Sequence, residues 1–560
     1  MSKTHSIDGA TVGTVSESTA GRLQSFLLPS LSDWVFAAML AWLFFGAAGA
    51  QSLLADGDAG WHIRLGEMLI ANRALPATDP FSFTMAGRVW FAWEWLSDLI
   101  LGAVHMVGGL PGVVLLAGVV IAATMAMMLR YMLWLGVNFF LAVGATMMIG
   151  GVSTMHWLAR PHMFTWGLLL ATLWLLEADR RKPSKRVWLL IPITAVWVNL
   201  HGGFVAGVVT VGAFGAGVAL EQLWAARQAD GKWSWFIPPA ARRYGLLLAG
   251  CAAATLLNPW GWHLHAHILA YLQSDFILKY VQEFQSPNFS KGFMKPLEAT
   301  ILLTLMLCGR MVWRGEFVWP LLTLAWAHAA LTSVRHAPLF MIVAAPVLAL
   351  ELTRFLDEGA RQGNSLLQTL KEIADDYSGK KASTASEVGL PLLSWLTIAA
   401  VVALGVTLDR RQGEEHWRAE FPAVRFPKLA CDALAERLTQ GRVLTTDQWG
   451  DYLIYRLHPE YHAFIDGRSD FYDPQVRDDY LALMGAKWNW ASLLARYEFD
   501  AVLAPLDWPL GNLLKTDANW ELVYDDGQAL YFERRRPSSE PAAGARYEEP
   551  PRANLLGRLR

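Results

Sequence analysis

The sequence predicts a membrane protein of the all-α class, with about eleven transmembrane helices and an extracytoplasmic α/β domain near the C-terminus. Three observations support this prediction. Of the 560 residues, 54% are hydrophobic and only 17% are charged, which is less charge than soluble domains carry. The apolar residues gather in runs long enough to cross about 30 Å of hydrocarbon. The 27 Trp residues fit the aromatic belts at membrane–water interfaces.

Composition and motifs exclude several classes of function. The formal net charge of -2 says little about partners, but no segment resembles a basic nucleic-acid surface, so no nucleic-acid partner is expected. The sequence has no Walker A loop, no GxGxxG motif after a strand, no HExxH and no CxxC. Cys251 and Cys308 lie in apolar runs and Cys431 is alone in the tail domain, so no disulfide framework is expected.

Eleven apolar runs are predicted to cross the membrane. They cover residues 34–54, 110–129, 137–154, 162–178, 186–200, 203–225, 243–257, 297–313, 317–332, 337–354 and 390–408. Short loops between them carry clustered Arg and Lys, most clearly at 179–186, and the positive-inside rule places these loops in the cytoplasm. We therefore expect a multi-pass protein of a bacterial inner membrane, with the N-terminus in the cytoplasm and the C-terminus outside it.

Residues 90–109 are apolar enough to suggest a further span. If they crossed the membrane, the basic loop at 179–186 would lie outside the cytoplasm. We therefore expect an external interfacial helix that carries Glu94 and Asp98. A twelve-span arrangement with a re-entrant segment is the alternative.

The composition divides the chain into four parts. These are a disordered cytoplasmic N-terminus (1–30), a transmembrane part (31–409) with external loops at 55–109 and 258–296, an α/β domain (410–536) and a disordered tail (537–560). The expected strands of the α/β domain are 443–446, 462–466 and 501–504, its helices 451–457 and 493–497, and its closing hairpin 520–524 with 529–533.

A short acidic segment, Asp56-Gly57-Asp58-Ala59-Gly60-Trp61-His62, opens the first external loop. Carboxylates at a membrane rim are costly unless they have a use. Two of them one residue apart can share a divalent cation such as Mg²⁺ or Mn²⁺, or one can act as a base that the other orients. Residues 59–71 have helical periodicity, so His62 and Asp58 can share a face. The alternative is an Asp N-cap on a surface helix.

Further along this loop come Gly66, Pro76, Asp79-Pro80-Phe81-Ser82-Phe83 and Trp93-Glu94-Trp95. Together with the many spans, this pattern resembles the GT-C glycosyltransferases that use polyprenyl-phosphate sugars. It is most similar to the group of protein O-mannosyltransferases and lipid A aminoarabinose transferases. The resemblance covers the arrangement of all eleven spans, and its motifs lie in the first external loop.

The resemblance implies a role for two residues of the acidic segment. Asp58 matches the catalytic Asp of the family, the base that activates an acceptor hydroxyl, and Trp61 takes the place of the aromatic after it. Ala59 replaces the acidic partner that the family often has, and Asp56 could substitute from the other side. His62 and Glu94 are further candidates for substrate binding in this loop.

Basic residues at outer span ends could hold the phosphate of the donor. Arg160 and His162 lie at one such end, and Arg335 and His336 lie at another. Arg presents a planar fork to phosphate oxygens. The alternative is snorkelling to lipid head groups. Two more candidates are His201, which could face the cavity, and Glu283 of the second external loop, which could approach the acceptor.

Other chemistry-bearing groups are interpreted as structural. His263, His265 and His267 would share a face only on a strand, where they could bind a metal. In the tail domain, the segments 447–451 and 466–470 are acidic and are typical of helix caps and turns. A substrate-facing role is the alternative for both segments.

The predicted function is transfer of a sugar from a polyprenyl phosphate to a glycan, lipid or protein acceptor outside the cytoplasm. Asp58 and Asp56 are the predicted catalytic residues, and they are also the candidate ligands of the divalent cation. Membrane lipids are further expected partners. One alternative is a transporter or flippase for lipid-linked glycans, which predicts internal repeats and charges at mid-membrane. Another is a non-catalytic assembly protein that docks partners on the α/β domain.

Overall fold

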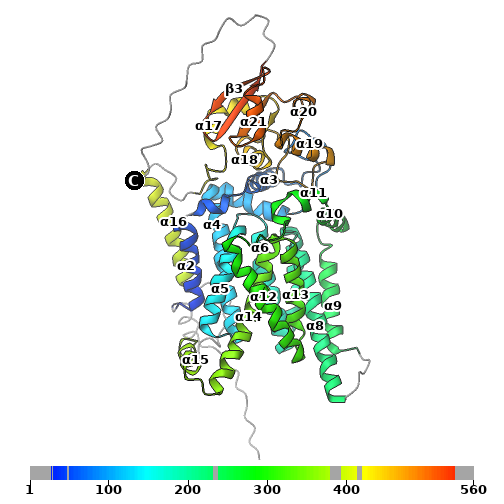
Figure 1. The fold of residues 1–560 in the computed structure, drawn as a ribbon, viewed down its shortest axis with the longest axis vertical. Coiled ribbons are helices and arrows are strands. Elements are labelled where there is room, and N and C mark those ends of the chain that lie inside the picture. Colours follow the sequence, from blue (N-terminus) through cyan, green and yellow to red (C-terminus); the bar gives the residue numbers. More distant parts are fainter. Residues whose placement is uncertain are drawn as a thin grey trace, which may run out of the picture.

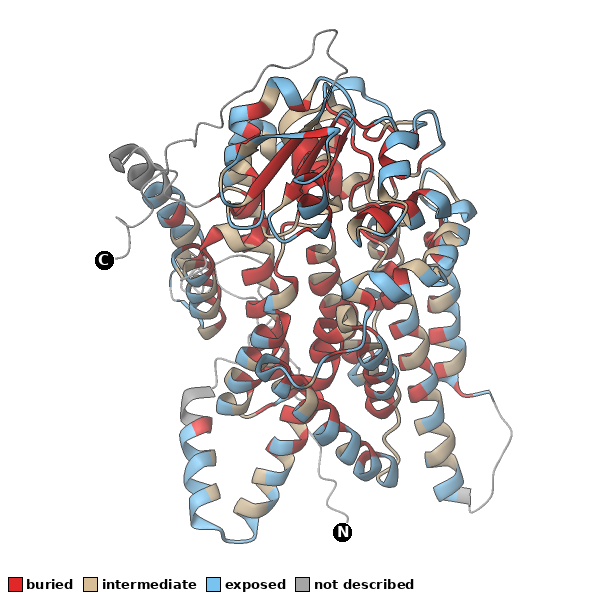
Figure 2. Cartoon of the chain, turned by 45° about the horizontal axis from the view of Figure 1, so that its top comes forward, coloured by how far each residue is buried: buried red, intermediate tan, exposed pale blue. Residues whose placement is uncertain are grey.

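The computed structural model describes residues 27, 29–46, 49–230, 237–378, 392–412 and 419–535. Figure 1 shows a bundle of long helices with a smaller domain of strands and short helices at one end. Buried residues line the inner sides of the long helices and the strands of the smaller domain (Figure 2). The predicted disordered segments lie outside the described residues, apart from a few positions at the end of 1–30.

Long helices build the bundle. They are α2 (Leu31–Phe45), α4 (Trp95–Leu135), α5 (Phe139–Ser153), α6 (His162–Arg181), α7 (Leu190–Leu200), α8 (Phe204–Asp230), α9 (Pro239–Ala254), α12 (Lys295–Trp313), α13 (Val318–Thr332), α14 (Ala337–Arg361) and α16 (Leu392–Gln412). A further helix, α15 (Ser365–Ser378), packs on α14 and α5.

Five helical segments of the described chain are long and apolar enough to cross a membrane. They are Trp95–Leu135, Phe139–His156, Phe204–Ala229, Gly292–Trp313 and Val334–Arg361. Three shorter helices, Leu31–Phe45, Val318–Thr332 and Leu392–Leu404, are also apolar. Each of the eleven predicted runs overlaps a helix. The helical membrane architecture is therefore confirmed, whereas the number of eleven crossings stays a prediction.

Two predicted segments differ from the structure because glycines interrupt the helices. The first predicted run, 34–54, is not one helix, since α2 ends at Phe45 and the 3₁₀-helix η1 (Ala50–Leu54) follows Gly49, whose φ is +59°. In the segment 90–109 the helix begins only at Trp95 and continues into the next predicted run. Gly109, with φ +59° and ψ −158°, breaks α4 there.

Outside the bundle, short helices connect the long ones near the smaller domain. They are α3 (Asp58–Asn72), η2 (Thr154–His156), α10 (Trp262–Leu272), α11 (Asp275–Tyr280), η4 (Gln282–Phe284), η5 (Gly292–Met294) and η6 (Val334–His336), while η3 (Lys185–Leu189) precedes α7. The helix predicted over 59–71 is therefore confirmed as α3. The three alternating histidines 263, 265 and 267 lie on α10, where helical geometry directs them apart.

The first arm of α4 supports α3 through a contact between two glycines. A Cβ atom at Gly66 would lie 1.9 Å from the carbonyl oxygen of Asp98, and one at Gly102 would lie 2.4 Å from the carbonyl carbon of Gly66. Only glycine allows the two backbones to approach this closely. The contact fixes the acidic start of α3 relative to Glu94 and Asp98.

The smaller domain has one four-stranded sheet with helices around it. Its strands are β1 (Val443–Leu444), β2 (Ala501–Pro505), β3 (Trp520–Asp525) and β4 (Ala529–Arg534), in the order β1-β2-β4-β3. Its helices are α17 (Lys428–Leu438), α18 (Asp447–Leu457), α19 (Pro474–Met484), α20 (Trp490–Arg496) and α21 (Pro509–Leu514). β1 pairs with β2 in parallel, and β4 pairs antiparallel with both β2 and β3, which confirms the closing hairpin.

The strand predicted at 462–466 is wrong. This segment forms no strand of the sheet. Its only bridge in the described chain is parallel, between Ala463 and Ser82 of the first external loop. Ala463 donates its N–H to the carbonyl of Phe81 and accepts the N–H of Phe83, at 2.8 and 3.0 Å. The segment is therefore buried against the first external loop, and the bridge joins the smaller domain to that loop.

Candidate active site

The acidic segment lies where α3 meets the smaller domain. Asp58 is the first residue of α3, and its N–H donates to the side chain of Asp56 at 3.0 Å. The N-cap residue is Gly57, so neither Asp occupies the N-cap position that the alternative interpretation expected. Asp58 has a different environment, because it is only 7% exposed and faces inward. A buried carboxylate needs a charged or hydrogen-bonding partner.

Arg160 is that partner. Its Nη2 lies 2.5 Å from Oδ2 of Asp58, and its Nη1 lies 2.8 Å from Oδ2 of Asp56. Oε1 of Glu283 lies 3.3 Å from the same Nη1. One guanidinium thus bridges three carboxylates from the two external loops. The Arg fork suits this geometry because its N–H groups point in fixed directions.

The charges of this cluster shift its pKa values. Burial raises the pKa of Asp58 to about 7, with a smaller contribution from Asp56, although Arg160 works in the opposite direction. Burial also acts to raise the pKa of Glu283. There the attraction of Arg160 and Arg335 prevails and holds the pKa at about 2. Near neutral pH, Asp58 can therefore exchange a proton while Glu283 stays charged.

Glu94 lies between two histidines. Nε2 of His62 is 3.8 Å from one of its carboxylate oxygens, and Nε2 of His201 is 3.5 Å from the other. Nδ1 of His62 contacts Asp98 at 2.5 Å. Nδ1 of His201 accepts the N–H of Gly203 at 3.0 Å, so its proton is on Nε2 and points at Glu94. Burial raises the pKa of Glu94 to about 7.

The second Arg–His cluster lies nearby. Nη1 of Arg335 donates to the Tyr271 hydroxyl at 3.1 Å, and its guanidinium lies 5.1 Å from the centre of the Phe284 ring. His336 donates through Nδ1 to the carbonyl of Ala329 at 3.2 Å. His162 is in hydrogen-bonding contact with the carbonyl of His156 at 2.6 Å. Within the described chain, Arg335 therefore has fewer partners than Arg160.

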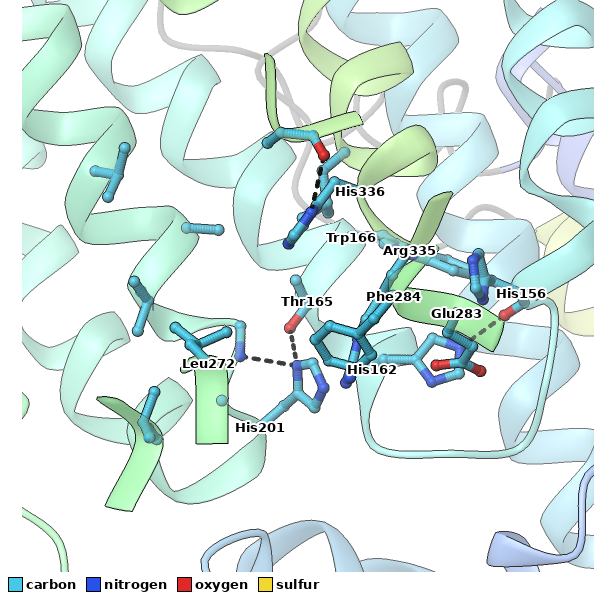
Figure 3. Close-up of a pocket in the computed structure, with 18 of the residues that line it drawn as sticks. His156, His162, Thr165, Trp166, His201, Leu272, Glu283, Phe284, Arg335 and His336 are labelled. Atoms are coloured by element: carbon cyan, nitrogen blue, oxygen red, sulfur yellow. Dashed lines mark hydrogen bonds between the residues drawn. The ribbon is translucent and has the colours of Figure 1, made fainter. Parts of the chain in front are cut away.

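Two adjoining cavities meet at these residues. One is polar and has a volume of about 70 Å³, with Asp58, Trp61, His62 and Glu94 in its wall. The other is larger, at about 280 Å³, and is lined mainly by apolar groups of α6, α8, α13 and α14 such as Trp166, Trp326 and Leu339. Arg160, His162, His201, Tyr271, Trp93 and Arg335 line both. Figure 3 shows Arg335, Glu283 and His162 on one side of the larger cavity and His201 with Thr165 on another.

The structure thus brings the predicted site residues to one place. Glu283 and His336 line the larger cavity, and Asp56 reaches the site through Arg160. The smaller domain also contributes to the site, because Gly467, Arg468 and Asp470 line the polar cavity. For the acidic segment 466–470, the sequence favours caps and turns, and the position at the cavity agrees with the alternative of a substrate-facing role.

Arg468 shows why that segment is ordered. Its guanidinium is buried and paired with Asp466 at 2.6 Å and with Asp79 at 2.8 Å. The rings of Trp90 and Phe81 lie 4.6 and 5.1 Å from its Cζ. Because Asp79 belongs to the first external loop, this ion pair fixes the smaller domain over the polar cavity.

The predicted divalent cation requires several ligating side chains close together. In the described residues no group of three or more His, Cys, Asp or Glu side chains could hold a metal ion. The two predicted ligands, Asp56 and Asp58, are instead paired with the Arg160 guanidinium. The donor set does not fit a divalent cation as it is arranged, so the cation stays a prediction, and no chemical step proposed for this chain uses it.

Comparison with known proteins gives the fold. No family model and no curated protein sequence matches this chain. The oligosaccharyltransferase of Archaeoglobus fulgidus in its apo form aligns with a TM-score of 0.51 and 12% identity, over 85% of this chain and 69% of that chain. AglB from the same organism, in complex with an inhibitory peptide and a dolichol-phosphate, aligns at 0.51 and 11%, over 89% and 73%. ArnT from Cupriavidus metallidurans, bound to undecaprenyl phosphate, aligns at 0.45 and 14%, over 92% and 100%.

Structural similarity at 11–12% sequence identity shows a common fold and does not show a common activity. The chain shares its fold with the archaeal oligosaccharyltransferase over 85% to 89% of its length. The GT-C fold expected from the acidic loop and the many spans is therefore confirmed. The activity is a separate matter and depends on the residues of the site.

Proposed function

We propose that this chain is an integral membrane glycosyltransferase that transfers a sugar from a polyprenyl-phosphate donor to an acceptor outside the cytoplasm. One observation carries the proposal. A polar cavity that contains Asp58 adjoins an apolar cavity between membrane helices, and Arg160 and Arg335 lie where the two meet. A sugar-charged polyprenyl phosphate presents matching groups in the same order, namely a polar sugar, an anionic phosphate and a long apolar chain.

The larger cavity suits the start of the lipid chain. Its wall is mainly apolar, with Trp166, Trp326 and Phe284 among the side chains, and it lies between helices of the bundle. Burying a hydrocarbon chain there is favourable by about 0.8 kcal/mol for each CH₂ group. A protein of the same fold has been solved with dolichol-phosphate, which makes a lipid phosphate a reasonable ligand for this architecture.

Arg335 is the better candidate for the phosphate. Arg160 already binds Asp56, Asp58 and Glu283, whereas the Arg335 guanidinium has the Tyr271 hydroxyl as its hydrogen-bond acceptor in the described chain. Its remaining N–H groups are therefore available for phosphate oxygens. The positive charge next to the leaving group would stabilise the negative charge that develops on the phosphate during transfer.

Asp58 is proposed to act as the base. The acceptor hydroxyl gives its proton to the Asp58 carboxylate, and its oxygen forms a bond to the anomeric carbon of the sugar. The bond from that carbon to the phosphate oxygen breaks, and the polyprenyl phosphate leaves with the electron pair. A pKa of about 7 suits a general base near neutral pH, because an appreciable fraction is ionised and can still hold the proton.

Reconstitution in lipid vesicles tests the proposal. The purified protein is incubated with a panel of labelled undecaprenyl-phosphate sugars and a membrane glycolipid extract as acceptor, and covalent transfer is measured. We expect transfer by the wild type and loss of at least about 100-fold in Asp58→Asn, the size typical of a general base. The matched control is Asp275→Asn, an exposed Asp at the start of α11 that lines neither cavity.

The same assay separates the alternatives. Uptake of the labelled lipid across the vesicle membrane without a covalent product would favour a flippase. Full activity in Asp58→Asn would contradict the assignment of the base.

A further inference from the structure

The two carboxylate oxygens of Asp58 have different surroundings. Oδ2 of Asp58 is held by Arg160, but Oδ1 is buried and has no hydrogen-bond donor among the described residues. A buried carboxylate oxygen without a hydrogen-bond donor destabilises the folded protein. Because Oδ1 belongs to the proposed base, we expect a hydrogen-bond donor close to it.

A second carboxyl group faces that oxygen. It belongs to Asp451 of α18, which is 0% exposed and packs against Asp58 beside Gly467. α18 can approach because α3 begins with small residues. A Cβ at Gly57 would lie 2.5 Å from the carbonyl oxygen of Gln448, and one at Gly60 would lie 2.7 Å from that of Asp451.

Gly467 closes the third side. A Cβ at this position would lie 1.8 Å from Oδ1 of Asp58 and 2.8 Å from Oδ2 of Asp451. The N–H of Gly467 donates to both oxygens of Asp451, at 3.0 and 3.1 Å. Asp58 and Asp451 are thus packed together beside the backbone N–H of Gly467. This N–H donates to Asp451, so it does not satisfy Oδ1 of Asp58.

Two carboxylates in this position cannot both be charged. Arg160 neutralises the Asp58 side of the pair, while Asp451 has no cationic partner among the described residues. Burial and the charge of Asp58 raise the pKa of Asp451 well above its usual range. A neutral carboxylic acid at Asp451 has one O–H to donate, which is what Oδ1 of Asp58 lacks.

We propose that Asp451 of the smaller domain is a positioning residue, whose carboxylic acid O–H donates a hydrogen bond to Oδ1 of Asp58. This inference rests on the proposed function for its role in catalysis. Arg160 and Asp451 then hold the two oxygens of Asp58 from opposite domains. Each oxygen keeps a further lone pair for the proton of the acceptor. The smaller domain would therefore complete the active site, and the membrane helices alone would leave the base without its second support.

Substitutions of Asp451 distinguish a proton donor from an ionised carboxylate. Asp451→Asn keeps an N–H donor for Asp58 and an oxygen for Gly467, so we expect transfer within about threefold of the wild type. Asp451→Ala removes the donor, and we expect kcat to fall about 10- to 100-fold, the effect of one hydrogen bond to a charged group. Asp447→Asn and Asp447→Ala are the matched controls, one turn earlier on α18 and bonded to the Tyr480 hydroxyl.

Two outcomes would overturn the proposal. If Asp451→Asn lost as much activity as Asp451→Ala, Asp451 would act as an ionised group, for example as a ligand of a cation. If Asp451→Ala kept wild-type activity while Asp58→Asn lost it, Asp58 would need no donor from the smaller domain.

A measurement without substrate keeps this inference separate from the proposed function. The melting temperatures of the purified wild type, Asp58→Ala, Asp451→Ala and the double variant form a thermodynamic cycle. We expect Asp451→Ala to lower the melting temperature clearly in the wild type and much less when Asp58 is already Ala. Additive effects would overturn the proposed hydrogen bond, even in a protein whose transferase activity is proven. A coupled cycle in a protein without transferase activity would support the hydrogen bond and contradict only the proposed function.

Discussion

Nη2 of Arg160 lies 2.5 Å from Oδ2 of Asp58, so the residue expected to bind phosphate is instead bound to the proposed base. The same guanidinium bridges Asp56 and Glu283, and it thereby ties the two external loops together. This arrangement assigns different tasks to the two arginines of the site. Arg160 holds the carboxylates, and Arg335 is left for the donor.

The first prediction concerns the pH dependence of transfer. Asp58 must be ionised to accept a proton, so activity should rise with pH through the pKa of about 7. Arg160→Lys keeps the charge but cannot bridge Asp56 and Asp58 with a fork, so it should attract the Asp58 carboxylate less. We expect the acid limb of the kcat profile to move to higher pH, by about one unit or less.

The control for this change is Arg243→Lys. Arg243 makes a comparable two-point contact with Asp179, at 2.8 and 2.7 Å, away from both cavities. Its pH profile should match that of the wild type. An unchanged acid limb in Arg160→Lys would contradict the role of Arg160 in setting the pKa of Asp58.

The second prediction concerns the donor phosphate. Arg335→Gln should raise the KM for the polyprenyl-phosphate sugar about tenfold or more, since a hydrogen bond to a charged group contributes about 1.5–3 kcal/mol. The measurement is a donor titration at saturating acceptor. Arg310→Gln, which removes an exposed pair with Glu358, is the control and should leave KM unchanged. A donor KM unaffected by Arg335→Gln would place the phosphate elsewhere.

The third prediction tests the close contact at Gly467. Gly467→Ala places a methyl group 1.8 Å from Oδ1 of Asp58, so the two domains must shift apart or Asp58 must turn away. We expect a loss of transfer of about 10-fold or more, together with a lower melting temperature. Gly511→Ala in α21 serves as the control, because its new Cβ would meet Leu530 at an ordinary 3.4 Å. Wild-type behaviour of Gly467→Ala would show that the domains are less tightly joined.

The fourth prediction concerns stability and pH. The folded-state pKa of Asp58, about 7, is above its usual value of 3.8, so the folded protein binds this proton more tightly than the unfolded chain. The stability that the folded protein gains from protonation of Asp58 is therefore fully present below about pH 4. It decreases as pH rises towards 7 and is absent above pH 7. Asp58→Asn removes the titration.

The melting temperature measured from pH 5 to pH 8 checks this sign. It should fall less steeply with pH in Asp58→Asn than in the wild type, where Glu94 adds a similar slope. A steeper fall in the variant would contradict a raised pKa at Asp58.

Much of the bundle could be predicted from the sequence, because long apolar runs have few stable solutions in a membrane. The helix over 59–71 was equally readable from its periodicity. The ends of such elements were less predictable. Gly46 takes an extended ψ of 172° where α2 ends, and Gly109 takes a positive φ where α4 bends. A glycine in an apolar run does not by itself indicate its conformation.

The candidate site was predictable on the membrane side only. Asp58 could be found because carboxylates at a membrane rim are costly, and Arg160 and Arg335 because each lies with a His at an outer span end, where a guanidinium can bind phosphate. The contributions of Asp451 and Gly467 could not, since acidic residues after a strand or before a helix are common as caps. Their meaning depends on the contact between α18 and α3, which joins residues almost 400 positions apart in the chain. No local pattern carries that information.

A density map of the protein with a bound undecaprenyl phosphate would test the central claim most directly. The account predicts that the phosphate contacts the Arg335 guanidinium at the junction of the two cavities, that the lipid chain occupies the apolar cavity, and that the sugar position lies beside Asp58. A phosphate bound on the opposite side of the membrane, or a lipid chain outside the apolar cavity with Asp58 out of reach, would contradict it.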